Sequence, residues 1–215
     1  MRVEIWSDVV CPFCYIGKRR FETALANFEH RDDVDVVLRS FELDPDAPTE
    51  PTEKVPTALA RKYGISTEQA LANMAGVDQM AAGEGLVFHQ ADAPHANTRD
   101  AHRLLHLALA EGGQSAQAAL NERLLQNYFV DAQNPADHAL LRESAIAAGL
   151  DPARVDQVLS TDEFDDDVEA DVARARAYGA TGVPFFVVDQ RYGIAGAQPT
   201  EAFSRTLEAA WNDRG

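Results

Sequence analysis

The sequence predicts an α/β protein in which one four-stranded sheet is interrupted by a large all-helical insertion. Residues 2–8 and about 34–41 have the alternating or apolar pattern of strands, with a helical period between them. After residue 56 the period stays helical through the middle of the chain. Residues 184–197 then return to a two-strand pattern, and 200–211 form a closing helix. The order β-α-β, helices, β-β-α is typical of a sheet built from both ends of a chain.

The first strand and helix place the two cysteines at their junction. Val3 and Ile5 fall on one face of the strand. The helix that follows has one apolar stripe at i, i+3, i+4 and i+7, made of Phe21, Ala24, Leu25 and Phe28. Cys11 and Cys14 lie between these two elements.

The segment 44–56 carries several prolines and no period, so it is predicted to be a linker or an extended loop. Ser66 and Gln69 have the spacing of a capping box and predict a helix from about 67 to 82. The next helix is expected to be capped by Thr98 and ended by Gly112 and Gly113. Two more are expected, one through Leu120, Leu124 and Tyr128 and one over 137–149. Asp151 and Pro152 are expected to open a short turn, and a last helix runs through Phe164, Val168 and Val172 and is ended by Gly179.

These elements predict two domains. Residues 1–50 and 180–215 are expected to form the sheet domain, and residues 51–179 the inserted helical domain. A chain of 215 residues is long enough for this arrangement.

Composition and charge exclude several classes of function. The chain is 46% hydrophobic and carries a net charge of −16, which disfavours nucleic acid and anionic membrane surfaces as partners. No apolar run approaches the roughly 18 residues that a membrane helix needs. Charges at Arg2, Glu4 and Asp8 leave no signal-peptide core at the N-terminus, so a cytoplasmic location is expected. Two cysteines are too few for a structural disulfide framework.

The stretch CPFC has the chemistry of a redox pair. Pro12 suits the first position of a helix, which makes Cys11 the capping residue. Unpaired N–H groups and the helix dipole at that end favour the thiolate form of Cys11. Cys14 lies one turn further on the same face, within reach for a disulfide. Cys11 is therefore expected to attack a disulfide, and Cys14 to resolve the mixed disulfide.

Neighbouring charges are given smaller roles. Lys18, Arg19 and Arg20 are interpreted as ordinary solvated charges on the helix. Asp8 is closer to the pair, and a carboxylate there works against a thiolate.

Other uses of the cysteines fit the sequence less well. Haem attachment needs a histidine where Tyr15 stands. A structural zinc site needs two more ligands, which only His102 and His106 could supply, and their distance along the chain matches no zinc-finger spacing. No metal site is predicted. Packing alone gives no reason for two unrelated thiols at this junction of strand and helix.

Four histidines in the helical segment leave two interpretations open. His89, His95, His102 and His106 are expected to be polar-rim residues or hydrogen-bonded residues of the interior. The alternative is that they line the active-site cleft, if the helical segment covers Cys11.

Three segments carry a family resemblance. "SDVVCPFCYIGKRRFE" (7–22) resembles the active-site segment of the DsbA-like thioredoxin-fold proteins, and most closely the FrnE-like branch, often described as polyketide-biosynthesis oxidoreductases or isomerases. "TGVPFFVVDQRYGIAGAQ" (181–198) resembles the cis-proline loop and hairpin of that family. "ANTRDAHRLLHLA" (96–108) resembles its helical domain.

The resemblance implies a thioredoxin fold with an inserted helical domain. It also implies that Cys11 is the nucleophile and Cys14 the resolving thiol. Val183 and Pro184 would form a cis peptide beside the pair, and would bind substrate together with the intervening Pro12 and Phe13.

The function expected from this resemblance is a thiol–disulfide oxidoreductase or disulfide isomerase. It would act on protein or small-molecule disulfides with no cofactor beyond its own thiols, with glutathione as a candidate redox partner. The alternative is a glutathione-dependent isomerase or transferase of a small aromatic or polyketide metabolite, because a sister group with that activity has a similar architecture. That group carries Ser where Cys11 stands, which favours exchange for this chain. A third hypothesis is a non-catalytic redox sensor or chaperone.

Overall fold

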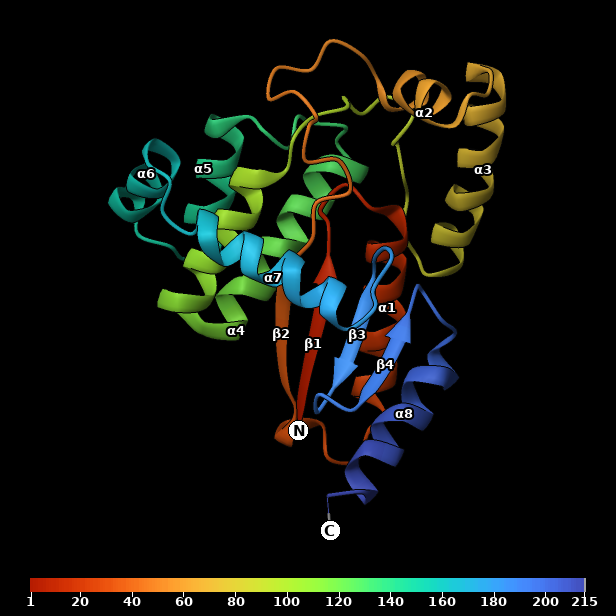
Figure 1. The fold of residues 1–215 in the computed structure, drawn as a ribbon, viewed down its shortest axis with the longest axis vertical. Coiled ribbons are helices and arrows are strands. Elements are labelled where there is room, and N and C mark those ends of the chain that lie inside the picture. The colour runs from red at the N-terminus through yellow and green to blue at the C-terminus, as the bar shows by residue number, and fades with distance from the viewer. Residues whose placement is uncertain (215) are drawn as a thin grey trace.

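The computed structural model describes residues 1–214 and is a mixed α/β structure (Figure 1). The strands are β1 (Arg2–Ser7), β2 (Asp35–Ser40), β3 (Phe185–Val188) and β4 (Tyr192–Ala195). The helices are α1 (Pro12–Ala26), α2 (Val55–Tyr63), α3 (Thr67–Gly83), α4 (Arg99–Phe129), α5 (His138–Ala147), α6 (Pro152–Ser160), α7 (Asp165–Ala177) and α8 (Thr200–Asn212), with a short 3₁₀ helix at Arg31–Asp33.

Both ends of the chain meet in one four-stranded sheet of order β2-β1-β3-β4. β1 runs parallel to β2, with Ile5 opposite Leu38. β3 runs antiparallel to β1, with Ile5 opposite Phe186, and β4 returns antiparallel to β3. The α/β architecture with a helical insertion that the sequence predicts is confirmed.

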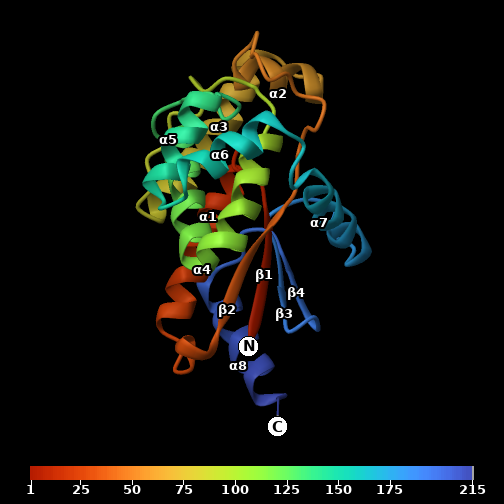
Figure 2. The same cartoon turned by 90° about the vertical axis from the view of Figure 1, so that its left-hand side faces the viewer.

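Helices cover both faces of the sheet (Figure 2). α1 and α8 cover one face, where Phe21 and Phe203 pack against Ile5 and Phe186. α7 covers the other face at Trp6, whose Nε1 donates to the backbone oxygen of Asp171 at 2.7 Å. β1 is therefore buried on both sides, although its alternating sequence predicts one apolar face. The predicted domain boundaries are 1–50 and 180–215 for the sheet domain and 51–179 for the inserted helical domain, so they assign α7 to the insertion. Residue 215 lies outside the described residues.

The remaining helices form their own core beside the sheet. α4, α5 and α6 bury the side chains of Leu104, Leu107, Leu120, Leu141, Val155 and Val158 together. α4 is broken at Gly113, where φ is 69°. The glycine pair thus ends one helix and begins the next, as the sequence predicts.

One helix lies where part of the extended linker was expected. α2 begins at Val55, inside the proline-rich segment 44–56. Pro56 does not prevent it, because a proline in the first turn loses no intrahelical hydrogen bond. Gly64 ends α2 in the left-handed region, at φ 65°. Only Val55 and Pro56 of this helix fall in the predicted linker, and the helix forms part of the wall of the candidate active site.

The helix caps agree with the sequence except at α4. The Ser66 hydroxyl accepts a hydrogen bond from the backbone N–H of Gln69, as predicted. Thr98 stands at the cap of α4, but its side chain forms no cap hydrogen bond. The Asn97 side chain accepts instead from the N–H of Arg99, at 2.7 Å. Thr98 is therefore the N-cap residue, as predicted, but its side chain does not form the capping bond.

Candidate active site

The two cysteines lie at the start of α1. Cys11 is the N-cap residue, with Pro12 in the first turn, and the N–H of Cys14 donates to the Cys11 backbone oxygen at 3.0 Å. Both thiols are free, and each residue is only 3% exposed. The Cys11 side chain makes no cap hydrogen bond to the helix. Its Sγ instead lies 3.5 Å from the carbonyl oxygen of Val183, to which it can donate.

The environment of Cys14 favours the protonated form of its thiol. Burial raises the pKa of the Cys14 thiol well above its ordinary value, and the hydrogen bond and charge repulsion from Cys11 raise it further. Hydrogen bonds from the Ser7 side chain and the Asp8 backbone act in the opposite direction and are outweighed. The dithiol therefore has a protonated partner at Cys14.

The loop before β3 crosses the start of α1. The Val183–Pro184 peptide bond is cis. A Cβ placed on Gly17 would lie 3.0 Å from Cγ of Pro184 and 3.4 Å from Cα of Ala197. This close approach explains why a glycine stands on the face of α1 that meets the loop.

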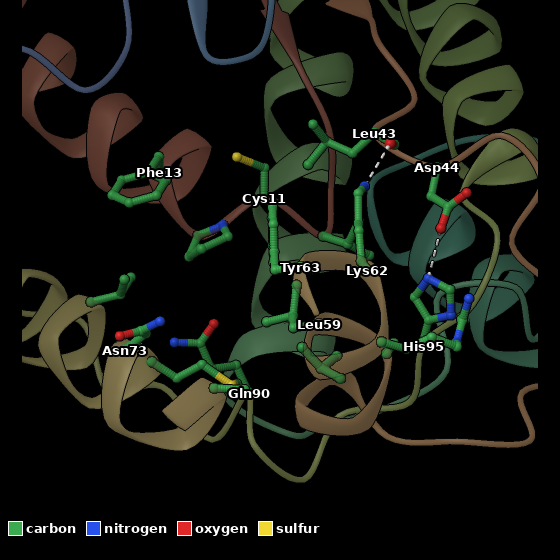
Figure 3. Close-up of a pocket in the computed structure, with 18 of the residues that line it drawn as sticks. Cys11, Phe13, Leu43, Asp44, Leu59, Lys62, Tyr63, Asn73, Gln90 and His95 are labelled. Atoms are coloured by element: carbon green, nitrogen blue, oxygen red, sulfur yellow. Dashed lines mark hydrogen bonds and ion pairs between the residues drawn. The ribbon is translucent and has the colours of Figure 1, made fainter. Parts of the chain in front are cut away.

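A cavity of about 600 Å³ opens beside Cys11 (Figure 3). Pro12, Phe13 and Val183, three of the residues expected to contact substrate, line it together with Cys11. Cys14 and Pro184 are not among its lining residues. The helical segment supplies most of the opposite wall, with the following residues: Val55, Ala58, Leu59, Arg61, Lys62 and Tyr63 on α2, Ile65 after it, and Ala70, Asn73, Met74 and Val77 on α3.

Of the four histidines, His95 alone lines this cavity, and its Nε2 lies 3.0 Å from a carboxylate oxygen of Asp44. His102 and His106 do not line the cavity, and each contacts an aspartate. His102 faces the buried Asp8, and His106 lies 3.2 Å from a carboxylate oxygen of Asp171.

His89 is also outside the cavity, and its Nδ1 contacts the backbone oxygen of Val130. Within residues 1–214, no three or more His, Cys, Asp or Glu residues are grouped so that they could hold a metal ion. Cys11 and Cys14 therefore do not form such a group with His102 and His106.

The basic residues of α1 are not ordinary solvated charges, so that prediction is wrong. Lys18 and Arg19 both bind the carboxylate of Glu122 on α4, and Arg20 binds Glu84 at 2.6 Å. Burial alone would raise the pKa of Glu122, but hydrogen bonds from Arg19, Lys18 and Tyr15 hold it at about 2. This cluster joins α1 to the helical segment, one to two turns beyond the cysteines.

Most of the cavity wall was missed from the sequence. Lys62 and Tyr63 lie on α2, which was expected to begin as an extended segment, and Asn73 and Met74 lie on the inner face of α3. Gln90 comes from the loop before α4. Two early signals are the helical stripe of α3, on which Met74 lies, and the alternative that the histidines line the cleft, which holds for His95.

The fold and the site together define a class: a thioredoxin-fold protein with a CxxC dithiol at the start of its first helix. The match to known families is specific. The model of the DSBA-like thioredoxin domain matches residues 2–208, and the chain belongs to this family. It is accordingly of the thiol oxidoreductase or isomerase kind, as the sequence predicts.

Three relatives are similar over nearly their whole length. A structure described as a "probable DsbA oxidoreductase" from Streptomyces coelicolor is 48% identical, with a TM-score of 0.93 over 100% of this chain and 92% of that one. The Bacillus subtilis protein YwbO, described as uncharacterized, is 27% identical over 96% of both chains. The "cytosolic disulfide reductase DsbM" of Pseudomonas aeruginosa, in a structure with GSH, shares the fold at 18% identity, with a TM-score of 0.68 over 99% and 100% of the two chains.

No helix within residues 1–214 is both long enough and apolar enough to cross a membrane.

Proposed function

We propose that this protein exchanges disulfides through Cys11 and Cys14, as an oxidoreductase or a disulfide isomerase. The observation that carries the proposal is the unequal position of the two thiols. Cys11 lines the cavity, whereas Cys14 does not and has a pKa raised by burial. A nucleophile has to meet the substrate, and a resolving thiol has to remain protonated until the mixed disulfide has formed.

The proposed exchange balances without another cofactor. The Cys11 thiolate attacks one sulfur of a substrate disulfide, the substrate S–S bond breaks, and one half leaves as a thiolate that takes up a proton. Cys14 then loses its proton to solvent and attacks the Cys11 sulfur. The second half leaves, and Cys11 and Cys14 are joined. The substrate gains two electrons, and the protein loses two.

The relatives suggest the direction of the redox reaction and the partner that restores the dithiol. A relative with 48% identity is described as an oxidoreductase, and a fold neighbour is described as a cytosolic reductase in a structure with GSH. We therefore propose that the protein works in the cytoplasm and that a small thiol such as glutathione restores its dithiol.

The cavity favours a second candidate function. A volume of about 600 Å³ suits a small molecule, as in a glutathione-dependent isomerase or transferase. In that case Cys11 would contact glutathione, and Cys14 would be dispensable. The two candidates therefore differ in what they require of Cys14.

Substitution of each cysteine tests the proposal. Cys14→Ser should accumulate a mixed disulfide at Cys11, detected by intact mass, and should lose turnover with a disulfide substrate. Cys11→Ser should form no adduct. Full turnover by Cys14→Ser in a glutathione-dependent isomerisation would support the second candidate. An activity that survives the loss of both thiols would indicate a chaperone.

A further inference from the structure

We propose that the cavity beside Cys11 is the binding site for a small disulfide with an apolar body that carries a carboxylate, and that Lys62 holds the carboxylate. The inference rests on the proposed function, because the ligand's S–S bond is the one that Cys11 attacks. It goes further by naming the substrate class and the residue that selects it.

Access to Cys11 favours a slender ligand. The residue is 3% exposed and forms part of the cavity wall, so a substrate sulfur has to enter the cavity to reach it. Small-molecule sites are typically about 300–1,000 Å³, and this cavity measures about 600 Å³. A disulfide held in the surface of a folded protein is less able to enter the cavity than a small free disulfide.

The walls are suited to an apolar body. Leu59, Ile65 and Met74 face the cavity from α2, the turn after it and α3. Phe13 and Tyr63, which are 39% and 66% exposed, are large apolar side chains that also line the cavity. An aromatic or branched ligand would bury these surfaces, which is favourable because apolar area leaves water.

The charges of the lining select an anion. Arg61 is paired with Glu53 at 2.6 Å, and a carboxylate oxygen of Asp44, which also lines the cavity, lies 3.0 Å from Nε2 of His95. Lys62 has no carboxylate within ion-pair distance among residues 1–214, and its Nζ only donates weakly to the Leu43 backbone oxygen at 3.4 Å. In a chain of net charge −16, a cation without a carboxylate partner, on the wall of the cavity that Cys11 also lines, is well placed to bind an anionic substrate.

A buried amide adds a second polar contact, on the other side of the cavity from Lys62 in the view of Figure 3. Gln90 is 4% exposed, and its Nε2 donates to the Asp78 carboxylate at 2.5 Å. That bond fixes the amide, and its Oε1 accepts no hydrogen bond within residues 1–214. Gln90 also lines the cavity. Gln90 is therefore suited to accept from an N–H or O–H of the ligand.

The test compares two aromatic disulfides that differ in charge. Reduced protein is mixed with 5,5′-dithiobis(2-nitrobenzoate) or with its uncharged bis-amide. Each probe disulfide is reduced to two aryl thiols, and the protein is oxidised to the Cys11–Cys14 disulfide. The release of aryl thiol gives one rate constant for each probe. The readout is the ratio of these constants, because the two leaving groups differ in intrinsic reactivity.

Lys62→Gln should lower the carboxylate-to-amide ratio roughly fivefold, which is the upper end of what an exposed ion pair contributes. The matched control is Lys54→Gln, which removes the same charge from an exposed lysine paired with Asp92, outside the cavity. Its ratio should remain within twofold of the unmodified protein. Equal ratios in all three proteins, or equal losses in both variants, would overturn the role of Lys62. Much faster exchange with a protein disulfide than with either probe would overturn the substrate class.

A binding measurement separates this inference from the proposed function. The Cys11→Ser variant cannot exchange disulfides, so calorimetry with 2-nitrobenzoate thioethers measures the cavity alone. Binding that weakens with Lys62→Gln, in a protein whose thiols show no exchange, would support the site and contradict the exchange. Disulfide exchange whose rate and probe preference do not depend on Lys62 would support the proposed function and contradict the binding role of Lys62.

Discussion

The carboxylate of Asp8 lies 3.3 Å from Nε2 of His102, and each of the two residues is only 1% exposed. The other carboxylate oxygen of Asp8 accepts from the Leu43 N–H at 2.8 Å, and its backbone oxygen accepts from the Cys11 N–H at 3.1 Å. Asp8 thus ties the nucleophile's loop to the helical segment and to the cavity wall at Leu43. It also places a buried carboxylate in the loop that precedes the dithiol.

The first prediction concerns the carboxylate of Asp8. Asp8→Asn keeps an oxygen for Leu43 but removes a carboxylate that disfavours a nearby thiolate. The reduced form becomes relatively more stable, so the reduction potential of the pair should rise by about 30 mV, which corresponds to about 1.4 kcal/mol. Equilibration in glutathione buffers measures the change. Asp166→Asn, at an exposed position on α7, is the control and should leave the potential unchanged. A fall in potential for Asp8→Asn would contradict the account.

The second prediction follows from the raised pKa of Cys14. Because alkylation requires the thiolate, iodoacetamide at neutral pH should label native Cys14 far more slowly than the denatured protein. The rate should increase only as the pH rises well above the ordinary range for a thiol. Peptide mapping of Cys11→Ser gives the rate at Cys14 alone. Equal labelling of native and denatured protein at neutral pH would show that Cys14 is not protected.

The third prediction concerns Glu122. Its pKa is about 2 in the folded protein against an ordinary 4.5, so its stabilising effect is fully present above pH 4.5. The effect is lost as the pH falls from about 4.5 to about 2. Glu122→Gln should lower the free energy of unfolding at pH 7 by about 1–3 kcal/mol, because Lys18 and Arg19 lose their partner.

Urea unfolding at several pH values measures this loss. The exposed Glu208 on α8 provides the control, because Glu208→Gln should change stability by less than about 0.5 kcal/mol at any pH. The difference between Glu122→Gln and the unmodified protein should shrink as the pH approaches 2. A difference that stays constant between pH 7 and pH 3 would contradict the ion-pair explanation.

The fourth prediction compares two helical glycines. Gly17→Ala places a methyl group 3.0 Å from the Pro184 ring, so stability should fall by about 1–2 kcal/mol and disulfide exchange should slow. Gly76→Ala lies inside α3 with nothing within 4 Å, and should stabilise the protein by about 0.5–1 kcal/mol. Thermal unfolding and exchange rates measure both. Equal stabilisation by the two substitutions would show that the loop before β3 yields freely.

Much of the fold follows from local patterns in the sequence. The strands, the glycine break in α4 and the cysteines at the start of α1 each depend on a few neighbouring residues. The dithiol half of the site is predictable for the same reason. The wall formed by α2 is not, because the prolines of 44–56 mask a helix in which Pro56 occupies a tolerated position.

Long-range pairing accounts for the remaining differences. The partners of Lys18 and Arg19 are found at Glu122, about a hundred residues along the chain, and no local pattern indicates such a contact. The burial of His102 against Asp8 depends in the same way on how the helical segment docks. Lys62 became a candidate only once α2 was seen to face Cys11 across the cavity.

The most direct test of the central claim is a redox titration of Cys11 and Cys14. The protein is equilibrated in glutathione buffers, and free thiols and intact mass are measured. The account predicts a two-electron transition to an intramolecular disulfide, with a potential between about −270 and −120 mV, the range of thioredoxin-fold enzymes. A protein that forms only a glutathione adduct at Cys11, and no Cys11–Cys14 bond in any buffer, would contradict disulfide exchange as its function.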